Sequence, residues 1–159
     1  MKQIDFNRLF MQDQYQPLVY KVRNGANGAH DILFFNSYIH DATIFLDDIV
    51  FKRGKMDIPL ERICWELKGA DAETHACKSH IFINKVTDYF FTFNRTLLKN
   101  WTLPSKVSIS DFSLLKTETR SIFKFSLFLE SKFPDFEMSL ISAGNEYAIT
   151  IKDEINTFS

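Results

Sequence analysis

Apolar and polar residues alternate with a period of two along most of the chain from Tyr38 onward. Successive side chains of a β-strand point to opposite faces, so this alternation predicts strands with one buried face. The clearest run covers residues 121–130. Its expected core face carries Phe123, Phe125, Leu127 and Leu129, and its opposite face carries Lys124, Ser126 and Glu130. We therefore predict a strand over 121–130 whose four apolar side chains lie in the core.

Shorter runs of the same kind predict the other strands. They cover residues 18–22, 44–51, 55–67, 81–83, 89–93, 107–109, 136–140 and 147–151. The alternation changes parity at residues 47–48, which predicts a turn or a bulge there. Residues 53–55, Arg-Gly-Lys, predict a hairpin turn. Pro59 has no N–H to donate, so we expect its strand to lie at a sheet edge or to be irregular at that point.

Some segments lack this alternation. Near the N-terminus, one face of a predicted short helix is formed by Ile4, Phe6, Leu9 and Phe10. Residues 24–28 are rich in asparagine and glycine and predict a loop, with no clear helix start after it. We also expect a polar loop over 69–79 and a turn of helix over 97–101, ended by Pro104.

Roughly seven to nine strands with short connections are typical of an antiparallel β-sandwich or a partly open β-barrel. Strands and helices do not alternate along the chain, which excludes a doubly wound α/β fold. We expect one all-β domain over residues 1–159 with a short N-terminal helix. Residues 1–36 are expected to form a peripheral N-terminal segment of that domain.

The charges of the chain nearly cancel, with 19 Lys and Arg residues against 20 Asp and Glu residues. No basic stripe is visible along the sequence, so we expect no nucleic-acid partner. No apolar run is long enough to span a bilayer, and the first eight residues lack the apolar stretch of a signal peptide. We therefore expect a cytoplasmic protein without a membrane partner, in which Cys64 and Cys77 are free thiols.

The densest group of metal-ligand side chains is His75, Cys77 and His80. Imidazole and thiolate are ligands that zinc prefers, but a closed zinc site has four of them. His40 or Cys64 would have to complete the site through the fold. The alternative is a polar loop that leads into a strand. We adopt this alternative and expect no cofactor, and the candidate metal ligands are His40, His75, Cys77 and His80.

Two other groups of polar residues are candidates for chemistry. His40 is followed by Asp41, but neighbours on a strand point to opposite faces, so we expect no direct pair. In our interpretation Asp41 opens a turn and His40 is half-buried. The acidic residues around the predicted hairpin are Asp47, Asp48, Asp57 and Glu61. They are candidate ligands for a hard cation or, as we favour, a solvated hairpin edge.

Phenylalanine occurs 17 times, and these side chains exceed what one buried face of each strand accommodates. Ile122 and Phe128 lie opposite the core face of the 121–130 strand, and Phe90 lies opposite Phe91. A contiguous exposed apolar patch usually marks an interface. We predict that Phe90, Ile122 and Phe128 form part of a homodimer or partner-binding surface. The competing explanation is that residues 1–16 fold back and cover them.

The aromatic surplus has a second interpretation as the lining of a pocket. Side chains that face the inside of a curved sheet can enclose a small apolar ligand. The candidate lining residues are Trp65, Phe91, Phe93, Phe123 and Phe125.

Three segments together resemble a group of small bacterial β-rich proteins of unassigned function. The segments are residues 37–42 (SYIHDA), 47–49 (DDI) and 55–62 (KMDIPLER), and the stretch that contains them, residues 37–62, is about a sixth of the chain. Some similar proteins are immunity proteins of polymorphic toxin systems or accessory proteins of mobile elements. The resemblance implies a β-rich accessory protein that binds another protein, and it implies no catalytic residues.

No nucleophile elbow, P-loop or dinucleotide fingerprint occurs in the sequence. The leading hypothesis is therefore a non-enzymatic protein-interaction module of the immunity or accessory type. The alternatives are a β-barrel that binds a small apolar ligand and a metal-dependent enzyme.

Overall fold

The computed structural model describes residues 15–23, 28–67, 76–93, 96–97, 104–128, 136–143 and 147–154. Within these ranges the chain forms eleven β-strands, one α-helix and one turn of 3-10 helix. The elements of the first half are β1 (Val19–Arg23), α2 (Gly28–Ile39), β2 (Thr43–Phe45), η1 (Leu46–Asp48), β3 (Val50–Lys52) and β4 (Lys55–Ile63). Those of the second half are β5 (Ala76–Ile83), β6 (Val86–Phe93), β7 (Thr96–Leu97), β8 (Lys106–Lys116), β9 (Arg120–Phe128), β10 (Phe136–Ala143) and β11 (Ala148–Asp153).

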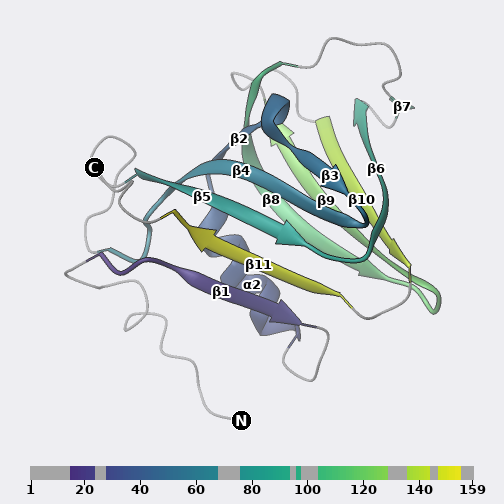
Figure 1. Cartoon of the computed structure of the whole chain (residues 1–159), viewed down its shortest axis with the longest axis horizontal. Coiled ribbons are helices and arrows are strands. Elements are labelled where there is room, and N and C mark those ends of the chain that lie inside the picture. Colours follow the sequence, from purple (N-terminus) through teal and green to yellow (C-terminus); the bar gives the residue numbers. More distant parts are fainter. Residues whose placement is uncertain are drawn as a thin grey trace.

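All described strand pairs are antiparallel and belong to one unclosed sheet. The strands follow the order β1-β11-β5-β4-β2-β8-β9-β10-β6-β7, and β3 pairs with β4 outside this series. Short β2 joins the two halves of the sheet, since it pairs with β4 on one side and with β8 on the other. Figure 1 shows β1, β11, β5 and β4 side by side, and we call these strands the first half of the sheet. It also shows β8, β9 and β10 side by side, and together with β6 and β7 they form the second half. The predicted all-β, antiparallel class is therefore confirmed.

One hydrophobic core takes side chains from both halves of the sheet and from α2. The predicted strand over 121–130 is confirmed as β9, where Phe123, Phe125 and Leu127 are buried. Leu129 lies outside the described residues. The alternating runs of β10 and β11 are buried in the same way, with Met138 and Ile149 fully enclosed. Burial of one face of each long strand is thus the main source of stability, because apolar area contributes about 25 cal/mol per Å2.

Helix α2 corrects the expectation that no helix begins after residues 24–28. Phe34, Phe35, Tyr38 and Ile39 of this helix are buried, and the helix contacts β1, β4 and β8. In Figure 1 it lies behind β1 and β11. Phe34 and Phe35, which lie within the first 36 residues, are therefore part of the hydrophobic core. The expected helix over residues 4–10 lies outside the described residues. No helix in the described ranges is long and apolar enough to cross a membrane.

The hairpin predicted at residues 53–55 is confirmed. Lys52 pairs with Lys55, so Arg53 and Gly54 form a two-residue turn. Their φ angles are 53° and 77°, and two consecutive positive φ values are the signature of a type I′ turn, which matches the twist of the flanking strands. The parity change at residues 47–48 corresponds to the 3-10 turn η1.

Pro59 does not lie in an edge strand, because β4 is paired on both sides. The expected irregularity at this point is confirmed. On one edge of β4, β3 pairs with residues 55–57 and β2 pairs with residues 60–61, so Pro59 falls between the two partners. The missing N–H of Pro59 therefore removes no hydrogen bond to a neighbouring strand on that edge.

The predicted polar loop and the predicted turn of helix are each wrong at one end. Residues 76–79 belong to β5 rather than to the expected polar loop over 69–79, because Cys77 and Ser79 point into the interior. Leu97 lies in β7, paired with Thr92, rather than in a turn of helix. Residues 98–101 lie outside the described part of the chain.

Candidate functional site

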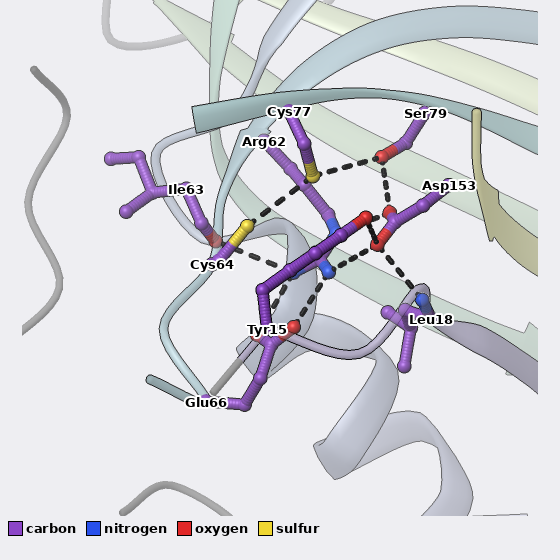
Figure 2. A network of polar contacts seen from close by, with 9 residues as sticks. All are labelled: Tyr15, Leu18, Arg62, Ile63, Cys64, Glu66, Cys77, Ser79 and Asp153. Atoms are coloured by element: carbon purple, nitrogen blue, oxygen red, sulfur yellow. Dashed lines mark hydrogen bonds and ion pairs between the residues drawn. The ribbon is translucent and has the colours of Figure 1, made fainter. Parts of the chain in front are cut away.

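A buried polar network joins the end of β4 to the end of β11 (Figure 2). Arg62, at the end of β4, is fully buried. Its Nε and Nη2 donate to the two carboxylate oxygens of Asp153 on β11, each at 2.7 Å. Its Nη1 and Nη2 donate to Glu66 at 2.9 and 2.6 Å. Every donor nitrogen of the guanidinium thus has a carboxylate partner, as a buried charge requires.

Asp153 is the centre of this network. It also accepts hydrogen bonds from the hydroxyls of Ser79 and Tyr15, at 2.6 and 2.8 Å, and from the backbone N–H of Leu18 at 2.9 Å. Burial alone raises the pKa of the Asp153 carboxyl, but the hydrogen bonds and charge of Arg62 outweigh burial and hold this pKa below its ordinary value. Since Arg62 and Asp153 have no exposed surface, the network holds strands together and offers no surface to a ligand.

Two thiols lie beside this network (Figure 2). Cys64 and Cys77 are both buried and both free, as expected from the sequence. Their sulfur atoms are 3.3 Å apart. The hydrogen bond between the two thiols raises the pKa of Cys64 and lowers the pKa of Cys77, and the nearby charge of Arg62 also lowers the pKa of Cys77.

His80 lies on the opposite, outer face of β5 between two carboxylates. Its Nδ1 is 2.7 Å from an oxygen of Asp57, and its Nε2 is 2.6 Å from an oxygen of Glu154. A carboxylate oxygen only accepts, so both contacts are hydrogen bonds when both ring nitrogens carry a proton. Burial alone lowers the pKa of His80, but the two carboxylates outweigh it and raise this pKa above the ordinary value. The ring of Phe82 stacks on the imidazole with 5.6 Å between centroids.

The candidate metal ligands that the structure describes are His40, Cys77 and His80, and they lie in different surroundings. Cys77 faces inward, whereas His80 faces outward on the same strand. His40 follows the last residue of α2, and His75 lies outside the described residues. Among the residues that the structure describes, no group of three or more His, Cys, Asp or Glu side chains could hold a metal ion.

His40 and Asp41 differ from the expectation. They lie in a turn after α2, where Asp41 has a φ of 61°, and not on a strand. Asp41 does take part in a turn, but His40 is exposed rather than half-buried, and its Nε2 lies 3.6 Å from a carboxylate oxygen of Asp41. The expected absence of a direct pair is therefore wrong, because turn geometry does not separate neighbouring side chains as a strand does.

The candidate acidic residues are also dispersed. Asp47 and Asp48 are exposed on η1, and Glu61 is exposed on β4. Asp57 is engaged by His80. This agrees with the interpretation of a solvated edge.

A groove of about 520 Å3 lies on the outer face of the first half of the sheet. The strand register aligns Val50, Asp57, Phe82 and Thr150 in one row across β3, β4, β5 and β11. Val50 is 53% exposed and Phe82 is 41% exposed. The rim nearest the hairpin turn is formed by Lys52, Arg53 and Lys55. The groove therefore combines an apolar floor with a cluster of positive charge.

The candidate pocket residues lie in different surroundings. Phe123 and Phe125 are fully buried, and both rings pack against Phe112. Phe91 and Phe93 are half-buried on β6. Trp65 lies in a separate surface hollow beside His40, to whose backbone carbonyl its Nε1 donates at 2.7 Å.

The candidate interface residues share the outer face of the second half of the sheet. Phe90, Ile122 and Phe128 are each half-buried rather than exposed. Ile122 is paired with Leu115 on β8 and with Ile141 on β10, which makes a short apolar row. Phe128 is separated from Ile122 along β9 by two intervening residues of the same face, Lys124 and Ser126. Participation of these residues in an interface stays a prediction.

Sequence reasoning missed the buried network, although the pattern contains a signal for it. Arg62 continues the inward parity of Ile58 and Leu60, and Asp153 continues the inward parity of Ile149 and Ile151. Two opposite charges at core-facing positions predict a buried ion pair. Comparison of the chain with protein-family models, with curated proteins and with solved structures found no match.

Proposed function

We propose that this protein is a non-enzymatic protein-interaction module whose groove binds an acidic, extended segment of a partner protein. The observation that carries the proposal is the combination of exposed Val50 and Phe82 with the basic rim of the hairpin. Three of the lining residues, Lys52, Arg53 and Lys55, carry positive charge. Asp57 is the acidic residue of the lining, and it is paired with His80.

Charge complementarity argues for an acidic partner. The chain as a whole has a net charge of −1, so the positive rim is a local feature and not a reflection of overall basicity. Such a local charge orients a partner and accelerates its association. The apolar floor adds binding free energy when a partner's apolar side chain covers Val50 and Phe82. A binding role of this kind agrees with the immunity or accessory type that the sequence resemblance implies.

The alternative of a small apolar ligand has less support. Its expected lining includes Phe123 and Phe125, which already fill the interior by packing against Phe112 and Tyr147. Of the two expected architectures, we propose the partly open barrel. The single series of strands from β1 to β7 favours it over a sandwich of two separate sheets.

The proposal is tested with a fluorescein-labelled decapeptide of alternating glutamate and leucine. We expect saturable binding that weakens with added salt, since screening acts on exposed charges. Charge reversal by Arg53→Glu should weaken binding at least fivefold, and Phe82→Ala should do the same. The matched control is Lys124→Glu, which reverses a charge on the outer face of the other half and should leave binding unchanged.

Amide chemical shifts identify where the peptide binds. The proposal requires the largest shifts in β3, the Arg53–Gly54 turn and Phe82. Equal binding of a lysine-leucine peptide, equal weakening by Lys124→Glu, or shifts centred on Phe90 and Ile122 would each overturn it. Tighter binding of an RNA oligonucleotide of equal charge would assign the groove to nucleic acid instead.

A further inference from the structure

The positions of Cys64 and Cys77 suit a covalent bond between them. Their sulfur atoms are 3.3 Å apart, so closure to the usual disulfide length near 2.05 Å requires an approach of about 1.3 Å. Cys77 is fixed in β5, where it pairs with Arg62. Cys64 lies just beyond Ile63, the last residue of β4 that pairs with β5. Cys64 can therefore move toward Cys77 without breaking a strand pair.

We propose that Cys64 and Cys77 form a dithiol site that hydrogen peroxide converts into an intramolecular disulfide. We assign the attacking role to Cys77, whose sulfur lies 3.9 Å from the hydroxyl of Ser79 and whose pKa is lowered by its contact with Cys64 and by the charge of Arg62. Cys77 carries the more acidic thiol and Cys64 the less acidic one. Because the thiolate is the nucleophile, Cys77 attacks the peroxide and Cys64 resolves the product.

The reaction balances with peroxide as the oxidant. The Cys77 thiolate attacks one peroxide oxygen, the O–O bond breaks, and hydroxide leaves to take up the proton lost from the thiol as water. Cys77 is then a sulfenic acid. The Cys64 sulfur attacks the Cys77 sulfur, the S–O bond breaks, and the hydroxyl leaves as a second water with the Cys64 proton. Two thiols are oxidised to one disulfide and one peroxide is reduced to two waters.

Burial limits which oxidant reacts. The two cysteines are 0% and 1% exposed, and Tyr15 packs against them. Peroxide is small enough to enter after a local opening, whereas bulky disulfide reagents need a larger one. The bond would tie the end of β4 to β5 beside Arg62, where the buried network already holds these strands. Oxidation should therefore raise the melting temperature without changing the fold.

The experiment treats the native, full-length protein with hydrogen peroxide and follows its intact mass. We expect a monomer lighter by two hydrogen atoms, restored by dithiothreitol. Trypsin cleaves after Lys68, which separates the two cysteines. The oxidised protein should therefore yield residues 63–68 and 69–78 as one linked pair. The chain has two cysteines, so no third thiol complicates the assignment.

Serine variants separate the two roles. Cys64→Ser should let peroxide stop at a Cys77 sulfenic acid that dimedone traps. Cys77→Ser should slow thiol oxidation about tenfold or more, because the remaining thiol is the less acidic one. Sulfinic acids without a linked peptide pair, a disulfide found only between molecules, or faster oxidation of Cys77→Ser than of Cys64→Ser would overturn the proposal. The mass and peptide measurements on the wild-type protein decide by themselves whether the disulfide forms. The proposal therefore stays testable even if a serine variant fails to fold.

Discussion

Arg62 and Asp153 are paired through two hydrogen bonds of 2.7 Å in a site without solvent contact, although 91 residues separate them in the sequence. A buried charge that loses its partner stays desolvated without compensation. Loss of either residue should therefore weaken the packing of β4 and β11, which lie on either side of β5.

Removal of the Asp153 charge should be strongly destabilising. Asp153→Asn keeps the size of the side chain but leaves the Arg62 guanidinium with Glu66 as its one charged partner. We expect the free energy of unfolding to fall by about 3 kcal/mol or more, as for other broken buried ion pairs. Urea denaturation measures it. Asp48→Asn, at an exposed position, is the control and should change stability by less than about 0.5 kcal/mol. A loss below about 1 kcal/mol for Asp153→Asn would contradict the assignment.

Stability should fall as the pH rises through the folded pKa of His80. The two carboxylates hold this pKa above its ordinary value of 6.5. Protonated His80 therefore stabilises the folded state fully below about pH 6.5, and this contribution disappears once the folded protein loses the proton. Because the groups are partly exposed, we expect about 1 kcal/mol at most.

The test for His80 compares urea midpoints from pH 5.5 to 8.5. His80→Gln should remove most of the decline seen in the wild-type protein. His40→Gln replaces an exposed imidazole and should leave the decline in place. An unchanged pH profile in His80→Gln would show that its carboxylate contacts do not stabilise the folded state.

The two faces of β9 should respond very differently to truncation. Phe125 is fully buried, so Phe125→Ala should cost about 3–5 kcal/mol through lost burial and a cavity. Phe128 is half-buried on the opposite face, and Phe128→Ala should cost less than about 1.5 kcal/mol by partial loss of burial. Calorimetric unfolding of both variants makes the comparison, and similar losses would contradict the assigned orientation of the strand.

Association through Phe90, Ile122 and Phe128 remains a prediction. If these residues form a homodimer surface, the protein should sediment as a dimer and Phe128→Asp should convert it into a folded monomer. Sedimentation velocity and circular dichroism provide the two readouts. A wild-type monomer whose sedimentation Phe128→Asp leaves unchanged would exclude the homodimer.

The hairpin turn should tolerate asparagine at position 53, whereas alanine at position 54 should destabilise it. Gly54 has a φ of 77°, where a Cβ atom is strained, so Gly54→Ala should cost about 1 kcal/mol. Arg53→Asn should be neutral or stabilising by a few tenths of a kcal/mol, since type I′ turns favour asparagine at the first position. Thermal unfolding measures both changes, and a stabilising Gly54→Ala would contradict the turn type.

The period-two pattern predicted the strands well because one face of each long strand is buried. The alternation around Phe123 and Phe125 was sufficient to predict β9. It failed at α2, where the continuous apolar run of residues 32–35 hides the helical spacing of Phe35 and Ile39. The positive φ angle of Gly54, by contrast, is one that a glycine in a predicted turn adopts readily.

The candidate site was harder to predict because tertiary pairing creates it. The groove exists because the register places Val50 on β3 in the same row as Phe82 on β5. Sequence spacing gives neither that row nor the contact of His80 with Glu154, which lies 74 residues away. Strand alternation also directs two of the candidate metal ligands, Cys77 and His80, to opposite faces of β5, which their short spacing in the sequence does not reveal.

The distance along the chain between Arg62 and Asp153 also constrains the order of events during synthesis. At roughly 5–20 residues per second, the ribosome needs about 5–18 s to add the residues that separate them. Throughout that interval the nascent chain lacks Asp153, one of the two carboxylates that allow Arg62 to leave water. The end of β4 therefore reaches its final packing only after β11 has been made, and until then the nascent chain depends on its other contacts to avoid aggregation.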